Sequence, residues 1–161
     1  MIVIADSSPL IVLLKIGHID VLPGLFESIV IPPAVDAEIK SYKSADVVRR
    51  FAAAPPSWLR TERPKATESV PKLHPGETEA INLAMELRAD LLLIDERRGY
   101  REALARKINV IGTVGVLERA AANGMLDLKE VFEKLKGTDF WISHRLLDQR
   151  LSIFNRQRGN G

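Results

Sequence analysis

The chain is predicted to be an α/β protein built around a parallel β-sheet. Two short segments, Ile2–Ala5 and Leu91–Ile94, are apolar at every position, which is typical of strands that are buried on both faces. Further apolar runs alternate with segments of helical periodicity, and glycine and proline separate them. This alternation predicts a parallel sheet whose strands are joined by right-handed helical crossovers.

The first part of the chain predicts three strands and four helices. The hydroxyl and proline residues Ser7-Ser8-Pro9 begin the first helix, and Gly17 ends it. The pair Pro32-Pro33 ends the second strand and opens the third helix. The expected strands are 2–5, 28–31 and, at an edge, 58–61, and the expected helices are 7–16, 18–26, 34–42 and 44–54.

An exposed loop is expected over residues 62–72, where prolines lie among charged and hydroxyl residues. A helix over 75–88 follows, and its inward side is expected to carry Ala80, Ile81, Ala84, Met85 and Leu87. The remaining strands are expected at 90–94 and 109–111, and the remaining helices at 99–107, 113–123, 128–135 and 143–154, with Thr113 as a helix cap.

The composition fits one domain and excludes several kinds of site. Its 161 residues are 46% hydrophobic and 27% charged, and the net charge of +2 creates no strong overall field. Because cysteine is absent, disulfides, zinc–thiolate sites and cysteine nucleophiles are excluded. No signal peptide is visible, and the apolar stretch Pro9–Leu14 is too short to cross a bilayer. We therefore expect a cytoplasmic protein without membrane contact.

Four acidic residues are expected to lie together at one edge of the sheet. Asp6 and Asp95 follow the two apolar strands, and the ligand crevice of an open α/β sheet lies beyond the carboxyl ends of its strands. Glu38 borders the apolar face of its helix, and Glu77 lies on the inward face at the first turn of its helix. Clustered carboxylates suit Mg²⁺ or Mn²⁺ rather than zinc or copper. The sequence therefore predicts metal-dependent phosphoryl chemistry.

Each of these acids also has a purely structural interpretation. Asp6 and Asp95 could each cap the following helix, and Glu38 could be an ordinary surface side chain. Glu77 and Glu79, which are two apart and cannot face the same way, could both complement the helix dipole. The joint placement of the four acids favours a site, because each lies at a strand end or near a helix start.

Hydroxyl and acidic neighbours extend this candidate site. Ser7 and Ser8 could bond to Asp6, to a metal-bound water or to a substrate phosphate, or could only cap the first helix. Glu96, which adjoins Asp95, could be a peripheral second ligand.

Two basic segments fit a polyanionic substrate. The segment Arg97–Lys107 has five basic residues and one acid, and Trp141–Gly161 has four arginines and one acid. Either segment could instead be a solvated helix face. Arg97, Arg98 and Arg101 follow the second apolar strand closely and could hold phosphate.

Two stretches of the sequence resemble the PIN domain family. Ile2-Val3-Ile4-Ala5-Asp6-Ser7-Ser8-Pro9-Leu10 resembles the family's opening strand. Gly76-Glu77-Thr78-Glu79-Ala80-Ile81-Asn82-Leu83-Ala84, followed by Ala89-Asp90-Leu91-Leu92-Leu93-Ile94-Asp95-Glu96, resembles its third and fourth acidic positions. The resemblance covers about residues 1–125 and is to short prokaryotic members that include VapC-like toxins. It implies one domain over residues 1–161, with helices from about residue 127 as an extension.

The resemblance implies a three-layer α/β/α sandwich with a mostly parallel sheet and a metal-dependent endonuclease that usually cleaves RNA. The acids implied are Asp6, Glu38, Glu77 and Asp95, with Mg²⁺ or Mn²⁺. Glu77 is preferred to Glu79 because it precedes Asp95 by eighteen residues, the family's usual spacing. An RNA substrate, a homodimer and a small antitoxin protein are the partners implied.

The chain departs from the common family pattern at three positions. Ser8 stands where many members have asparagine, and Glu77 stands where many have aspartate. Leu93 replaces a serine or threonine that many members carry two residues before the fourth acid, and Thr113 could supply a hydroxyl instead.

Three other functions remain open at this point. A phosphatase of the haloacid-dehalogenase type needs a second aspartate two residues after the first, where Ser8 stands. A phosphoacceptor receiver domain needs paired acids near the first strand and a lysine after a late strand, where the chain reads Gly112-Thr113. A catalytically inactive PIN module could bind nucleic acid or a protein partner, although all four acids are present here.

Overall fold

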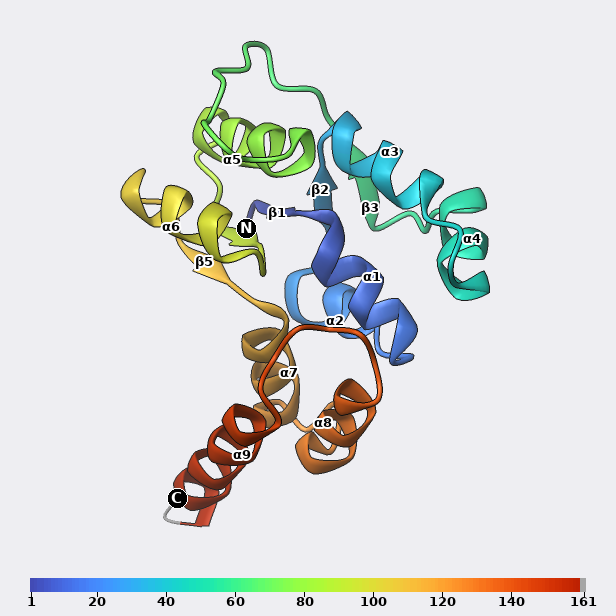
Figure 1. The fold of residues 1–161 in the computed structure, drawn as a ribbon, viewed down its shortest axis with the longest axis vertical. Coiled ribbons are helices and arrows are strands. Elements are labelled where there is room, and N and C mark those ends of the chain that lie inside the picture. The colour runs from blue at the N-terminus through green and yellow to red at the C-terminus, as the bar shows by residue number, and fades with distance from the viewer. Residues whose placement is uncertain (160–161) are drawn as a thin grey trace. The chain divides into compact units, whose positions relative to one another are not determined.

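A computed structural model describes residues 1–159, which divide into two compact units, Met1–Thr113 and the residues from Val114 onward. The first unit contains a sheet of five strands, counted within the described residues, and Figure 1 shows the strands and the helices that connect them. The strands are β1 (Val3–Ala5), β2 (Ile29–Ile31), β3 (Leu59–Thr61), β4 (Leu91–Leu93) and β5 (Val110–Ile111).

Helices connect the strands and form the second unit. Those of the first unit are α1 (Ser7–Lys15), α2 (Val21–Phe26), α3 (Pro33–Ser41), α4 (Asp46–Ala53), α5 (Pro75–Glu86) and α6 (Arg97–Ala105). The helix α7 (Thr113–Ala122) begins at the last residue of the first unit, and α8 (Leu128–Lys136) and α9 (His144–Gly159) follow. Within residues 1–159, no helix is long and apolar enough to cross a membrane.

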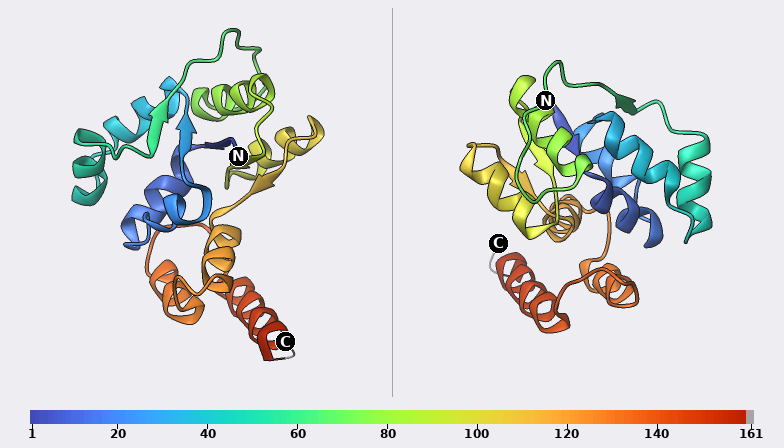
Figure 2. Two further views of the ribbon diagram at one scale, coloured as in Figure 1. Left: turned by 180° about the vertical axis from the view of Figure 1, so that it is seen from behind. Right: turned by 45° about the horizontal axis from the view of Figure 1, so that its top comes forward.

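All strand pairs are parallel, in the order β3-β2-β1-β4-β5. Ile4 is in register with Val30 of β2 and with Leu92 of β4. From β1 the chain moves first to β2 on one side and returns later to β4 on the other, as Figures 1 and 2 show. The order of the strands therefore reverses between β1 and β4, and such a switch point is where open α/β sheets bind ligands.

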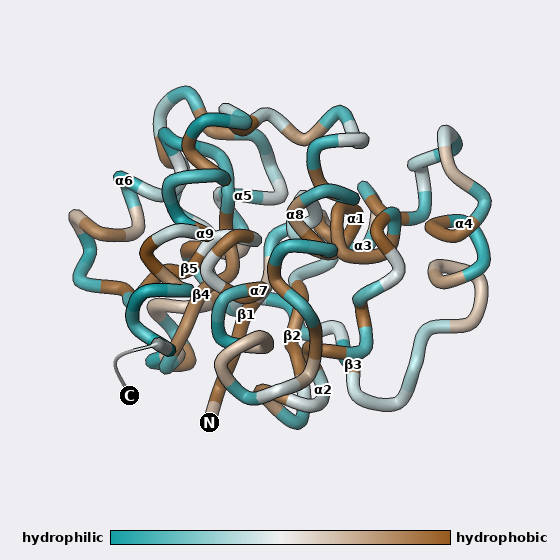
Figure 3. The backbone as a smooth tube through the Cα atoms, turned by 90° about the horizontal axis from the view of Figure 1, so that it is seen from below, coloured by the Kyte–Doolittle hydropathy of each residue, from teal (hydrophilic) through white to brown (hydrophobic). Residues whose placement is uncertain are grey.

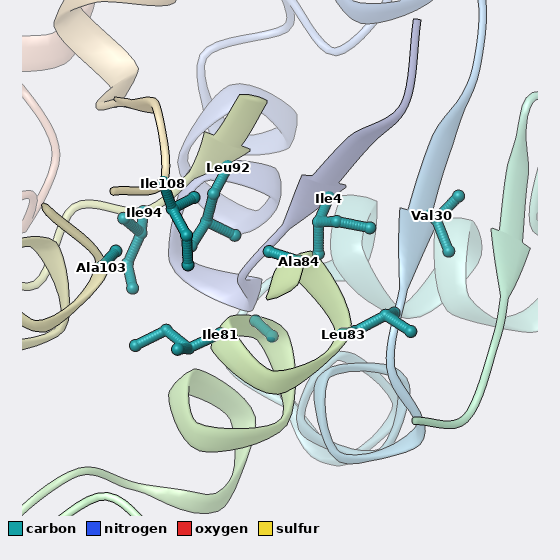
Figure 4. Close-up of a cluster of buried hydrophobic side chains, with 10 residues drawn as sticks. Ile4, Val30, Ile81, Leu83, Ala84, Leu92, Ile94, Ala103 and Ile108 are labelled. Carbon is teal, nitrogen blue, oxygen red and sulfur yellow. The ribbon is translucent and has the colours of Figure 1, made fainter. Parts of the chain in front are cut away.

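The core explains why the strand segments are apolar throughout. Figure 3 shows the hydrophobic colouring of β1, β2 and β4. Helix α5 packs on β1 and β4, and Figure 4 shows a cluster of buried side chains from α5, the sheet, α6 and the segment after α6. This cluster comprises Ile4, Val30, Ala80, Ile81, Leu83, Ala84, Leu92, Ile94, Ala103 and Ile108. The α/β/α architecture and the parallel sheet predicted from the sequence are confirmed.

Several element boundaries differ from the prediction. Helix α2 begins at Val21 rather than 18, because Gly17 has a φ of 75° and His18 donates back to Leu13, which makes a turn first. Helix α6 begins at Arg97 rather than 99, because Glu96 caps it. The last helix runs to Gly159 instead of ending at 154.

Met85 does not face the core as predicted, and 47% of it is exposed. Successive residues turn by about 100° around a helix. The buried arc of α5 runs from Leu83 through Ala80 and Ala84 to Ile81, and Met85 lies beyond its edge. Met85 follows Ile81 by four residues, but Ile81 itself lies at the edge of the arc.

The segment 62–72 is not a fully exposed loop, because Pro64 and Val70 are buried. Two side chains of α5 hold it in place. The backbone N–H of residue 65 donates to Glu86 (2.8 Å), and Asn82 exchanges two hydrogen bonds with the backbone of Glu68, both 2.9 Å long. Local composition did not reveal this long-range attachment.

We expect Leu92→Ala to lower the free energy of unfolding by about 3 kcal/mol, because Leu92 is fully buried in β4 and its truncation leaves a cavity. Met85→Ala removes a half-exposed side chain and should change stability by less than about 1 kcal/mol. Urea unfolding of both variants measures the difference. Equal effects of the two substitutions would contradict the assignment of the core.

Candidate functional site

Asp6 lies at the switch point of the sheet. Its backbone N–H donates to the Leu93 carbonyl of β4 (2.9 Å), and only 3% of the residue is exposed. It occupies the position before α1, but its side chain makes no capping hydrogen bond. The carboxylate oxygen Oδ1 is buried and has no hydrogen-bond partner among the described residues. The capping interpretation is therefore wrong, and Asp6 presents a buried acceptor that the fold leaves unused.

Glu38 joins α3 to the starts of α1 and α5. The Ser7 hydroxyl donates to Glu38 Oε2. Gly76, in the first turn of α5, has no room for a side chain, because a Cβ there would overlap the Glu38 carboxylate. The neighbouring acid Asp36 instead forms an ion pair with Lys40 at 2.7 Å. Glu38 is thus the acid of α3 that is held toward the sheet edge.

Glu77 is a buried acid, 7% exposed, in the first turn of α5. Its Oε2 accepts a hydrogen bond from the His74 backbone N–H (2.8 Å), as part of the capping box of this helix. As predicted, Glu79 does not face the same way as Glu77. It accepts a hydrogen bond from the Ala34 backbone N–H (3.2 Å) at the start of α3. Glu79 thus serves another helix, a role that the spacing within α5 could not indicate.

Asp95 is held by the start of α7. Its two carboxylate oxygens accept hydrogen bonds from the Thr113 backbone N–H (2.7 Å) and the Thr113 hydroxyl (2.6 Å). A Cβ on Gly112 would lie 2.9 Å from Asp95 Oδ1, so the close approach depends on glycine. Helix α6 is capped by Glu96, which accepts from Gly99 (2.7 Å). Asp95 therefore does not cap α6, the helix that follows it, and the capping interpretation is wrong.

Burial and mutual repulsion change the acidity of this cluster. Burial, with the charges of Glu77, Glu38 and Asp95, raises the pKa of Asp6 to about 7, although the Ser7 backbone N–H opposes the shift. Burial also raises the pKa of Glu77, aided by Glu96 and Glu38 and opposed by the His74 backbone. Desolvation raises the pKa of Asp95 against the two Thr113 hydrogen bonds. The Asp6 pKa thus responds to the charges of the other three acids.

The residues predicted to bind substrate fall into two groups. The first group consists of hydroxyl residues. Ser7 and Thr113 are buried and donate to Glu38 and Asp95 respectively, and Ser8 is half-buried. The other three, Arg97, Arg98 and Arg101, are exposed on α6. The two buried hydroxyls orient carboxylates in this structure, and the arginines lie in the helix that follows Asp95.

The donor set suits a hard divalent cation, because every oxygen comes from a carboxylate and Asp6 Oδ1 is unpaired. Within residues 1–159, no group of three or more histidine, cysteine or acidic residues converges closely enough to hold a metal ion. Three of the acids already accept hydrogen bonds, Glu38 from Ser7, Glu77 from His74 and Asp95 from Thr113. Asp6 is the acid with a buried oxygen still free.

Comparison with known families identifies the fold. The family model described as "DUF3368: PIN domain" matches residues 2–156. The chain belongs to the PIN domain family. This assignment confirms the resemblance found in the sequence and supports a nuclease fold, in a family that typically uses divalent metal ions.

A solved structure also shares this PIN fold. It is "a PilT N-terminus domain protein SSO1118 from hyperthemophilic archaeon Sulfolobus solfataricus P2", with 19% sequence identity and a TM-score of 0.50 over 89% of this chain and 98% of that one. At this identity the likeness concerns the fold alone. The sequence has no significant match among curated proteins.

We expect the metal-free protein to lose stability as the pH rises from about 4 to about 7. Asp6 has a pKa of about 7 when folded and 3.8 ordinarily, so in this window the folded chain keeps a proton that the unfolded chain has released. Stability from this group is complete below 3.8 and is lost as the pH rises through 7, by up to about 1.4 kcal/mol per pH unit.

Urea unfolding in EDTA at pH 5, 6, 7 and 8 measures this dependence. Asp6→Asn, which cannot ionise at this position, should show a shallower decline than the unaltered protein. Parallel curves for the two proteins would contradict the assigned protonation of Asp6.

Proposed function

We propose that this PIN domain protein is an endoribonuclease that depends on Mg²⁺ or Mn²⁺. The observation that carries the proposal is the buried, unpaired carboxylate oxygen of Asp6 at the switch point between β1 and β4. An unpaired carboxylate beside three other acids costs folding free energy unless a cation or a proton offsets it. Family membership supports the nuclease class.

The hydrogen bonds of the four acids suggest a different role for each pair. Asp6 and Asp95 would hold the ion directly, and the two Thr113 donors fix the orientation of Asp95. Glu38, oriented by Ser7, and Glu77, oriented by His74, would complete the oxygen shell or orient the attacking water. A divalent ion bound here would lower the pKa of a water molecule and neutralise charge on the leaving oxygen.

The exposed arginines Arg97, Arg98 and Arg101 would hold the phosphates on either side of the scissile bond. Single-stranded or looped RNA is the substrate class proposed from the family resemblance. By the same resemblance, the protein would act as the VapC-like toxin of a toxin–antitoxin pair, form a homodimer and be inhibited by a small antitoxin protein. The cytoplasm is the proposed compartment.

We expect Asp6→Asn and Glu38→Gln each to lower RNA cleavage at least about 100-fold, because each removes a carboxylate from the cluster. Asp36→Asn is the matched control: it lies two residues from Glu38 on α3, its partner is Lys40, and cleavage should stay within about twofold. The measurement is cleavage of a mixed structured RNA with Mg²⁺ or Mn²⁺, compared with EDTA and with single-stranded DNA.

The outcomes separate nuclease from scaffold. Metal-dependent cleavage that Asp6→Asn abolishes supports the proposal, whereas cleavage that survives this substitution points to a contaminant. If the folded protein neither cuts RNA nor binds Mn²⁺ in a calorimetric titration, the inactive PIN module is the better description.

We expect Gly76→Ala to lower cleavage about tenfold or more while the fold persists, because the new methyl group would displace the Glu38 carboxylate. Gly137→Ala is the control, since its Cβ would come no closer than 3.4 Å to the Lys134 carbonyl. Cleavage rates and urea unfolding of both variants are compared. Full activity of Gly76→Ala would argue against a role for Glu38 in its present position.

A further inference from the structure

Trp141 is exposed to an unusual degree for a large aromatic side chain. It lies between α8 and α9, and 92% of its surface is exposed. The other tryptophan, Trp58, is half-buried beside Phe51, with ring centroids 6.0 Å apart. Because Trp141 contributes almost nothing to the core, its aromatic face is available to a ligand.

One side of α9 carries a continuous polar and basic stripe. Its members recur at intervals of four, three and four residues, which places them along one face of the helix. We call this the α9 stripe, and it comprises Arg145, Gln149, Ser152 and Arg156, all of which are exposed. At 1.5 Å per residue, the two arginines are about 16 Å apart along the helix axis.

The arginines of this stripe are uncompensated, unlike the others of α9. Arg150 forms an ion pair with Glu118, and Arg158 donates to the Ala121 carbonyl (3.0 Å). Among the residues that the structure describes, neither Arg145 nor Arg156 has an ion pair or a side-chain hydrogen bond. The acid beside the stripe, Asp148, is already paired with Lys136 (2.7 Å), so the charges of Arg145 and Arg156 face solvent without a partner in the described part of the chain.

We propose that Trp141 and the α9 stripe form a binding surface for single-stranded RNA, in which a base stacks on Trp141 and phosphates contact Arg145 and Arg156. The choice of RNA rests on the proposed nuclease function, and the surface itself is carried by residues outside the acidic cluster. Aromatic stacking and arginine–phosphate contacts are the two components of single-strand recognition that does not depend on sequence.

A second copy of the chain fits this surface less well. If two α9 stripes paired in antiparallel fashion around a two-fold axis, Arg145 of one copy would face Arg156 of the other. The carboxylate beside the stripe, on Asp148, is already paired with Lys136 and does not offset that repulsion. A phosphodiester backbone provides the missing negative charge.

The test uses the full chain with Trp58→Phe, which leaves Trp141 as the only tryptophan. The probe is a fluorescein-labelled 12-nucleotide oligouridylate RNA in EDTA, so that binding is read without cleavage. We expect saturable quenching of Trp141 fluorescence that follows the rise in anisotropy. In the parent chain, Trp141→Ala should weaken binding roughly tenfold, with Trp141→Phe recovering part of it.

The charge contacts are tested by the salt dependence of the same binding. Arg145→Gln and Arg156→Gln should each reduce the slope of log affinity against log salt by about 0.7. Lys129→Gln is the matched control, because Lys129 lies on α8 among three acids and one further lysine, Asp127, Glu130, Glu133 and Lys134, so its surroundings do not attract RNA. This control should leave both affinity and slope unchanged.

Three results would overturn the proposal. The first is no binding of the RNA by the folded protein, and the second is binding without quenching that Trp141→Ala, Arg145→Gln and Arg156→Gln all leave intact. The third is sedimentation that shows a dimer which Trp141→Ala dissociates. Since the assay needs no cleavage, it is independent of the nuclease proposal. If the protein cleaves RNA and Trp141→Ala changes neither cleavage nor binding, the nuclease function stands and the proposed binding surface is wrong. If the protein binds RNA through this surface but does not cleave it, the binding surface stands and the nuclease function is wrong.

Discussion

The arrangement of the candidate site depends on helix N-termini that meet carboxylates at one edge of the sheet. Glu79 accepts from the start of α3, Glu77 caps its own helix α5, Glu96 caps α6 and Asp95 accepts from the start of α7. Each helix start offers unpaired N–H groups and a partial positive charge. These donors offset part of the repulsion and desolvation that arise when several acids lie close together, and they fix the directions of the carboxylates.

Asp6 differs from the other acids in having a buried carboxylate oxygen with no hydrogen-bond partner among the described residues. The helix starts therefore orient Glu77 and Asp95, but one strong acceptor, on Asp6, stays unsatisfied in a buried position. Buried unsatisfied groups are rare and are concentrated where proteins function. The buried oxygen of Asp6 therefore costs folding free energy that a bound cation would offset.

Much of the fold followed from local sequence signals. The apolar runs around Ile4 and Leu92 predicted strands, and Asp6 and Asp95 could be located at their ends because parallel strands share one carboxyl edge. What failed depended on distant partners. Glu79 bonds to another helix, Val70 is buried in a loop that α5 holds, and Thr113, which was predicted as a helix cap, donates its hydroxyl to Asp95. Those contacts join residues 14 to 45 positions apart, which no local pattern reports.

The shortness of the outer strands has a consequence for how the chain behaves at high concentration. β3 has three residues and β5 has two, and β3 carries the charged Arg60, which pairs with Glu62 just beyond it. An outer strand offers unpaired backbone groups to other chains in proportion to its length, and charged side chains obstruct such pairing. The sheet therefore ends in edges that are poor templates for cross-β aggregation, and it achieves this without closing into a barrel.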